Sequence, residues 1–242
     1  MHHLWNTSLD NAKWYLNDNV LNVADNINYL GAVLSDNSNI HVRARISSCQ
    51  KSFYALQGAG LCKNGVSPDT LAYLWNTAVR PVLLYGTHCM NLSHKSINEM
   101  EKTQCKFLKC ALGLPKFSKN TPIRRAIGVR CIADTIEFAQ LDLLKSIFKN
   151  SSRAKIFYAS RLSEHFVDLC PKYRRDSLVI RALGVCDKRS ISLVRYIYDD
   201  TYSSSQKRLA MQQPDDGLAD SVKQLLMSSQ DNELLHMLLS PF

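Results

Sequence analysis

The strongest constraint on the fold is a run of five apolar residues that recur at steps of four, three, four and three: Val42, Ile46, Cys49, Phe53 and Leu56. Such steps place side chains on one face of an α-helix, whose turn takes about 3.6 residues. Residues 39–57 are therefore predicted to form an amphipathic helix. Gly58 and Gly60 follow it, and glycine adopts the left-handed conformation that ends helices.

A second helix is predicted from a clear start signal. Ser67 can cap the helix, Pro68 suits its first turn, and Asp69 places a negative charge beside its positive end. The apolar run continues to Gly86, so this helix should be buried. Pro81 lacks an N–H and crowds the preceding turn, so we expect a kink near Ala78.

Similar signals bound the next segments. Ser93 should begin a helix that ends at Gly113, and Pro115 prevents its continuation. Thr121–Pro122 should cap a short helix. From Asp134 onward the apolar spacing predicts helices within 134–148, 156–169, around 178–180 and around 191–196, with two weaker helices at 218–228 and 231–239. Disorder is expected mainly near residues 203–205 and 212–217, which are rich in Ser, Gln, Pro and Asp.

The first 36 residues have a different pattern. Trp14–Leu16 and Val20–Val23 are separated by the polar run Asn17–Asn19, which predicts a hairpin, and 28–34 should add another strand. Within 28–34, Tyr29-Leu30-Gly31 should end one extended segment and 32–34 should begin another, as in a short hairpin. Gly31 has no Cβ and permits close approach of another chain. The predicted fold class is mostly α, a helical bundle preceded by a small antiparallel β element. The expected divisions are 1–36, 37–132 and 133–242.

Composition excludes several classes. The chain of 242 residues is 45% hydrophobic, enough to bury a core. No apolar run approaches the ~20 residues that cross a bilayer, and the start lacks the pattern of a secretory signal. We therefore expect an intracellular protein with no membrane partner. Its eight cysteines form no CxxC pair, so free thiols in a reducing compartment are favoured.

Positive charge is concentrated in one region. Residues 101–130 contain eight Lys and Arg residues against Glu101 alone, whereas 214–242 contain five acids against Lys223. Lys102, Lys106 and Lys109 are spaced four and three apart and should form one ridge. A ridge of this kind is either a solvated helix face or a phosphate-binding surface.

Several motifs, taken in order, resemble the segment that follows the palm of a reverse transcriptase from a non-LTR retrotransposon of the jockey or RTE-like group. They span about 14–130: Tyr29-Leu30-Gly31, then 43–46 (RARI), 53–56 (FYAL), Trp75, 79–86 (VRPVLLYG), 104–109 (QCKFLK) and 112–115 (LGLP). The resemblance implies a thumb-like helical domain of an RNA-directed DNA polymerase. It also implies that Tyr29, Leu30 and Gly31 lie near a primer end.

The palm of that family, which would need Mg²⁺, precedes this segment, so we expect no catalytic residue and no cofactor in this chain. A thumb holds a duplex by its phosphates without reading bases. The expected partner is thus RNA or an RNA–DNA duplex, together with association with the absent polymerase half. The expected nucleic-acid-binding residues are Arg43, Arg45, Lys102, Lys106, Lys109, Lys116, Lys119, Arg124 and Arg125.

Other chemistry finds little support. Asp199 and Asp200 lie beside one another, as metal-binding polymerase aspartates do, but Ile197 stands where an aromatic is required and the pair follows the Gly31 region instead of preceding it. The acidic end of a helix entering a serine-rich loop explains the pair better. His88, Cys89, His94 and Cys105 fit no zinc spacing. The alternative to nucleic-acid binding is a degenerate or repurposed helical domain that binds a protein partner through 131–200.

Overall fold

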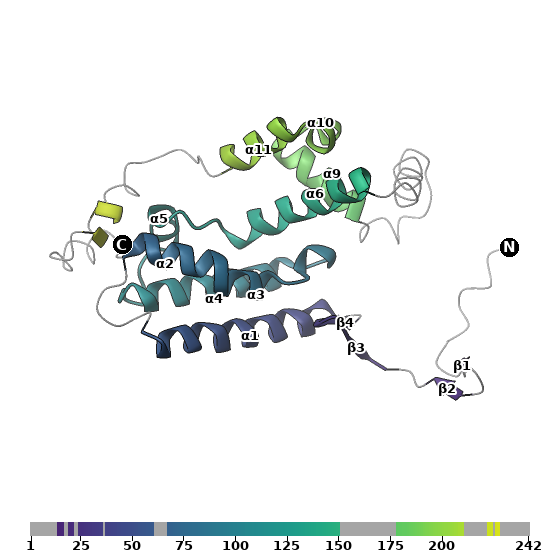
Figure 1. Cartoon of the computed structure of the whole chain (residues 1–242), viewed down its shortest axis with the longest axis horizontal. Helices are drawn as coiled ribbons and strands as arrows, with labels where there is room; N and C mark the ends of the chain where they lie inside the picture. Colours follow the sequence, from purple (N-terminus) through teal and green to yellow (C-terminus); the bar gives the residue numbers. More distant parts are fainter. Residues whose placement is uncertain are drawn as a thin grey trace.

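The computed structural model describes residues 14–16, 19–21, 24–35, 37–60, 67–150, 178–210, 222–224 and 226–227. Helices dominate these residues, and short antiparallel strands precede the first helix, so the predicted fold class is confirmed (Figure 1). The elements are β1 (Trp14–Leu16), β2 (Asn19–Leu21), β3 (Asn26–Tyr29), β4 (Ala32–Ser35), α1 (Ser38–Gly58), α2 (Pro68–Leu74), η2 (Trp75–Val79), α3 (Arg80–Leu84), η3 (Thr87–Cys89), α4 (His94–Ala111), α5 (Asn120–Ala126), α6 (Ile132–Asn150), α9 (Leu178–Arg189), α10 (Leu193–Tyr198) and α11 (Asp200–Leu209).

The strands form two separate hairpins, β1 with β2 and β3 with β4. The prediction that 28–34 adds one strand to the first hairpin is wrong, whereas the hairpin expected at Tyr29-Leu30-Gly31 is confirmed. Leu30 and Gly31 have φ of 48° and 77°, the conformation of a two-residue hairpin turn, so β4 folds back on β3. The Gly31 stretch is therefore a turn between two strands.

Helix α1 carries the predicted apolar stripe. Val42, Cys49 and Phe53 are buried, and Ile46 and Leu56 pack against the same core. The helix begins where the side chain of Asn37 accepts a hydrogen bond from the N–H of Asn39, 3.0 Å away. The predicted helix is confirmed.

Helices α2, η2 and α3 form one continuous helical segment with a π-helical turn in its middle. Ser67 caps the start, as predicted, by accepting a hydrogen bond from the N–H of Thr70. At the expected kink the N–H of Arg80 bonds the carbonyl of Trp75, which widens the turn just before Pro81. A π turn accommodates the proline ring, so the helix continues to Leu84.

The first core lies between α1, the α2–α3 segment and α4. The rings of Phe53 and Phe107 stack with centroids 4.3 Å apart, and Trp75 donates its indole N–H to Gln104 across 3.2 Å. Helix α4 begins at the Ser93 cap and ends at Gly113, whose φ is 67°, as predicted. In Figure 1, α1 lies beneath α2, α3 and α4.

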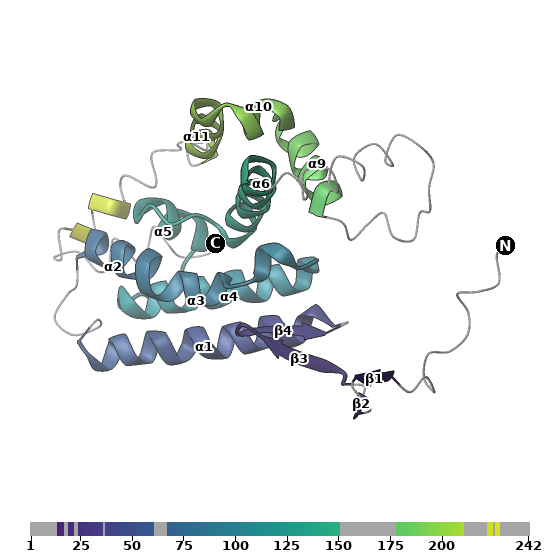
Figure 2. The same cartoon turned by 45° about the vertical axis from the view of Figure 1, so that its right-hand side comes forward.

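Helix α6 is shared between two cores. Its first turns place Ile132 and Ile136 in the first core, and 138–148 form a second core with α9 and α10. Figure 2 shows α6 lying between the α2–α4 layer and the α9–α11 group. The boundary between the two cores lies inside α6. The domain boundary expected at residue 132 stays a prediction.

The remaining expectations concern disorder and the later helices, and their outcomes differ. The serine-rich stretch 203–205 is helical in α11, so disorder there was wrongly predicted. Residues 222–224 and 226–227 are helical, and Val222 is buried against Ile123 and Ala126. The segments 156–169, 212–217 and 231–239 lie outside the described residues. Within the part of the chain that the structure describes, no helix has the length and apolar character needed to cross a membrane.

Candidate nucleic-acid interface

Helix α1 presents positive charge without any carboxylate, because none of its residues from Ser38 to Gly58 is Asp or Glu. Arg43 and Lys51 are exposed on its outer side. Arg45 is half-buried, with its guanidinium carbon 5.6 Å from the ring centroid of Tyr85. The outer side of α1 can therefore contact phosphates through two open cations, with Arg45 held beside them.

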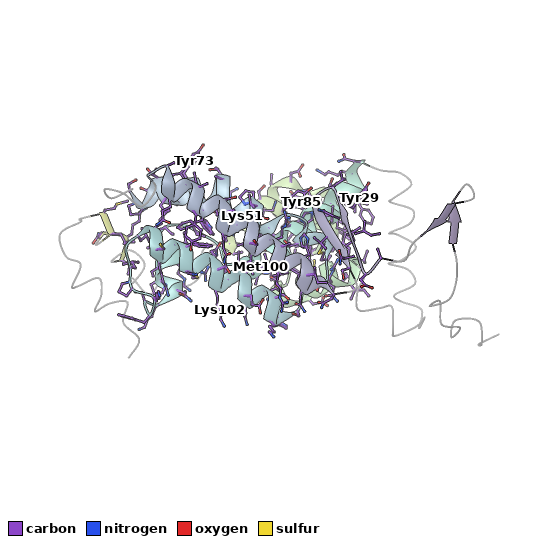
Figure 3. All side chains as sticks on the ribbon, turned by 90° about the horizontal axis from the view of Figure 1, so that it is seen from below. Tyr29, Lys51, Tyr73, Tyr85, Met100 and Lys102 are labelled. Carbon is purple, nitrogen blue, oxygen red and sulfur yellow. The ribbon has the colours of Figure 1, made fainter. Side chains whose placement is uncertain are left out.

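Helix α4 runs beside α1 in the same direction. The hydroxyl of Ser96 bonds the side chain of Asn39 near the start of both helices, and Phe53 stacks on Phe107 near their ends. Lys102 and Lys106 are exposed on α4, as the predicted ridge requires. Figure 3 shows Lys102 projecting at the side of the bundle away from Tyr73 and Tyr85.

Lys109 does not belong to the exposed ridge. It is 8% exposed, and its ammonium donates a hydrogen bond to the carbonyl of Lys116 over 3.0 Å. The left-handed Gly113 turns the chain back over the last turn of α4, so this loop covers a face that periodicity alone leaves open. Burial lowers the pKa of Lys109. The assignment of Lys109 to a phosphate-binding surface is corrected to a structural role.

Arg124 likewise has a structural partner. Its Nε lies 2.9 Å from Glu101 Oε1, and the other oxygen of Glu101 accepts a hydrogen bond from the N–H of Ile132 at 2.7 Å. This carboxylate joins α4, α5 and the start of α6. Tertiary packing thus places Glu101, the one carboxylate within 101–130, against Arg124.

The remaining predicted cations lie around α5. Lys116 is exposed, whereas Lys119 and Arg125 are half-buried. Helix α5 begins at Asn120 after Lys119, one residue ahead of the expected Thr121–Pro122 cap. We name four exposed cations the α1–α4 cations: Arg43, Lys102, Lys106 and Lys116.

The predicted primer-end residues lie at the tip of the β3–β4 hairpin. Tyr29 and Leu30 are 61% and 76% exposed. The hydroxyl of Tyr85 donates a hydrogen bond to the carbonyl of Leu30, 2.7 Å away. A Cβ on Gly31 would lie 3.7 Å from the Tyr85 ring, an ordinary contact. Tyr29-Leu30-Gly31 and Leu84-Tyr85-Gly86 are far apart in sequence and are therefore brought into contact by the fold.

His41 holds this contact together. The residue is fully buried; its Nδ1 accepts a hydrogen bond from the N–H of Val33 at 3.2 Å, and its Nε2 donates to the carbonyl of Tyr85 at 2.8 Å. The bond from Val33 requires the neutral ring, because Nδ1 cannot accept once it is protonated. Burial, opposed by the Tyr85 carbonyl and reinforced by Arg45, lowers the pKa of His41. The sequence alone does not predict this link, because only the fold brings Val33 and Tyr85 to His41.

A second link that the sequence did not predict is made by the half-buried Arg80. Arg80 donates to the side chains of Asn76, at 2.9 Å, and Thr135, and to the carbonyl of Arg130 at 3.2 Å. Burial, together with Arg130, lowers its pKa to about 10. An arginine inside the otherwise apolar run 79–86 was the available signal. Arg80 joins the α2–α3 segment to α6, and these hydrogen bonds engage its guanidinium in a structural role.

The Asp199–Asp200 pair has structural partners. Asp199 caps α11 by accepting a hydrogen bond from the N–H of Tyr202 at 2.9 Å, and Asp200 forms ion pairs with Lys145 and Lys149 at 2.6 and 2.8 Å. Hydrogen bonds from these two lysines lower the pKa of Asp200 to about 2. Over the described ranges, no three His, Cys, Asp or Glu side chains gather as metal ligands.

The sequence matches no protein family and no curated protein, and no solved structure matches the fold. The chemistry of the site thus has to be judged from its own residues. The exposed charge consists of lysine and arginine on two adjacent helices, and such groups contact phosphates without distinguishing bases.

Proposed function

We propose that this chain binds RNA or an RNA–DNA duplex through its phosphates, as the thumb-like part of an RNA-directed DNA polymerase of a non-LTR retrotransposon. The observation that carries the proposal is the arrangement of the α1–α4 cations. Helix α1, which has no carboxylate, lies parallel to α4, which exposes Lys102 and Lys106. The ordered motifs between residues 14 and 130 supply the family part of the proposal.

Synthesis of DNA is not part of the proposed role. Residues 1–28, which precede the Tyr29 hairpin tip, contain no pair of adjacent aspartates. The pair at Asp199 and Asp200 is engaged in a helix cap and two ion pairs. A primer-extension assay with Mg²⁺ and deoxynucleotides should therefore yield no templated product; accumulation of such a product would contradict the proposal.

Salt dependence of binding tests the proposal. Each phosphate contact releases counterions, so the log–log slope of affinity against salt should be roughly −0.7 to −0.9 per contact. With three or four of the α1–α4 cations engaged, the slope for a labelled RNA–DNA hybrid should lie at roughly −2 to −3.6 between about 50 and 200 mM salt. Absence of measurable binding at the lowest salt concentration would reject the proposal.

A protein-binding role has its own supporting observation. Val194 and Tyr198 on α10 and Leu209 on α11 are 68%, 66% and 56% exposed. Exposed apolar side chains of this kind occur at protein interfaces. Binding through them would respond little to salt. A repurposed helical domain without a nucleic-acid role is therefore favoured only if a partner binds at α10–α11 and the hybrid does not bind.

A further inference from the structure

A row of exposed tyrosines and cations follows the seam between α1 and the α2–α3 segment. Figure 3 shows Tyr73, Lys51, Tyr85 and Tyr29 in this order along α1, on the side away from Lys102. Tyr73 is 66% exposed, Tyr29 61% and Tyr85 48%. The predicted duplex contacts use none of these three rings.

Contacts between the elements make the row one surface. Helix α1 packs along η2, α3 and β4. These elements adjoin the segments that carry Tyr73, Tyr85 and Tyr29. At one end Tyr85 bonds the carbonyl of Leu30 and accepts the His41 bond through its own carbonyl. At the other end Tyr73 lies on α2, with its carbonyl bonded to the hydroxyl of Thr77. The row is thus fixed on helices and on a docked hairpin.

Positive charge predominates on this surface, and Asp69, one turn before Tyr73 on α2, is paired with Lys223 at 3.7 Å. No Asp or Glu occurs in α1, in residues 70–84 or in residues 26–35. Lys51 is exposed midway along the row, and the guanidinium of Arg45 lies over the Tyr85 ring, 5.6 Å from its centroid. Cations interleaved with open aromatic rings suit a polyanion that also has flat apolar faces.

We propose that Tyr29, Arg45, Lys51, Tyr73 and Tyr85 form a track for single-stranded RNA or DNA. Unpaired bases would stack on Tyr29 and Tyr73, and Lys51 would contact the phosphates between them. Arg45 adds positive charge beside Tyr85. A duplex keeps its bases stacked on one another, so it could contact this row only through phosphates and would leave the tyrosines unused.

The inference rests on the proposed function, because both assign nucleic-acid binding to this chain. The α1–α4 cations and the track are made of different residues. The duplex surface depends on Lys102 and Lys106 of α4, whereas the track depends on tyrosines on the other side of α1. A chain with both surfaces could hold a duplex together with the single strand that extends from it. The two surfaces can be tested separately.

The test measures binding of labelled oligo-dT and oligo-U of about 16 nucleotides, and of an RNA–DNA hybrid, to the full chain. The main variant is Tyr29→Ala/Tyr73→Ala, and Tyr29→Phe/Tyr73→Phe keeps the rings. Tyr198→Ala is the matched control, because Tyr198 on α10 is as exposed as Tyr73, at 66%. Circular dichroism confirms that each variant folds; the substituted side chains are exposed.

The track predicts that the alanine pair weakens single-strand binding about 25-fold or more, at about fivefold or more per stacked base, with an unchanged salt slope. The phenylalanine pair and Tyr198→Ala should bind as the unchanged protein does, and Lys51→Ala should reduce the slope by about 0.7. A difference in affinity between oligo-U and oligo-dT would identify which of the two strands the track prefers.

Single-strand binding that the alanine pair leaves unchanged would overturn the track. If the hybrid still binds in that case, the proposed function stands and only the inference fails. If neither the single strands nor the hybrid bind the unchanged protein, both fail. An equal loss in the alanine and phenylalanine pairs would also overturn it, because base stacking needs the ring and not the hydroxyl.

Discussion

Lys106 and Lys109 are one helical turn apart on α4, yet one is exposed and the other is buried beneath its own loop. Periodicity decides which face of a helix a side chain occupies, but the segment that folds over that face decides its role. The same distinction separates Arg43, which is open, from Arg124, which is paired with Glu101. At the scale of single residues, structural and phosphate-binding cations are therefore separable by substitution.

Lys109→Ala should lower the free energy of unfolding by about 1–2 kcal/mol, because the Lys116 carbonyl loses its charged donor. Lys106→Ala, on the open surface of the same helix, should change it by no more than about 0.5 kcal/mol. Denaturant unfolding monitored by circular dichroism measures both. Equal effects of the two substitutions would show that the Lys109 contact does not stabilise the loop.

His41 should make stability depend on pH. Its pKa in the folded chain is lowered from the ordinary value of 6.5, so below that value the unfolded chain binds the proton more readily. The stability that neutral His41 contributes is therefore fully present above about pH 6.5 and is lost as pH falls through the lowered pKa. Denaturant unfolding between about pH 7.5 and about pH 5 should show this loss.

The variant His41→Gln should have a shallower pH dependence over the same range, since glutamine does not titrate. His88→Gln is the control, because burial also lowers the pKa of His88 and its contribution must be separated. Identical pH profiles for the unchanged protein and His41→Gln would show that His41 does not link protonation to folding.

At the scale of elements, the β3–β4 hairpin packs on α1 through β4 and is joined to the helices by specific bonds. These include the His41 bonds to Val33 and Tyr85 and the Tyr85 bond to Leu30, beside close packing at Gly86. Gly86 has φ of 74°, and a Cβ there would lie 3.4 Å from the His41 ring and 3.5 Å from Ala32. The glycine thus allows the α3 end, α1 and the hairpin to meet.

Gly86→Ala should lower the free energy of unfolding by about 1–2 kcal/mol from backbone strain alone, and it should increase hydrogen exchange of the hairpin amides. Gly184→Ala is the opposite case. Gly184 lies within α9 and a Cβ there meets nothing within 4 Å. That substitution should stabilise the chain by about 0.5–1 kcal/mol. Destabilisation at both sites would contradict this account of Gly86.

At the scale of the whole molecule, the sequence predicted what local chemistry determines. The caps at Ser67 and Ser93 and the stop at Gly113 depend on neighbouring residues, and the structure confirms them. The pairing of Arg124 with Glu101 and the His41 bonds depend on segments distant in the chain, so periodicity could not reveal them. The candidate site was therefore predicted only in part: its helices and its open lysines, without the structural partners of Lys109 and Arg124.

The most direct test of phosphate binding compares two matched double variants on an RNA–DNA hybrid across a salt series. Lys102→Ala/Lys106→Ala removes two exposed lysines of α4, and Lys188→Ala/Arg208→Ala removes two exposed cations of α9 and α11, of which Lys188 is paired with Glu137. The account predicts that the first pair flattens the log–log slope by roughly 1.4 to 1.8, while the second leaves it unchanged. Equal slopes for both pairs, or no binding by the unchanged chain, would contradict it.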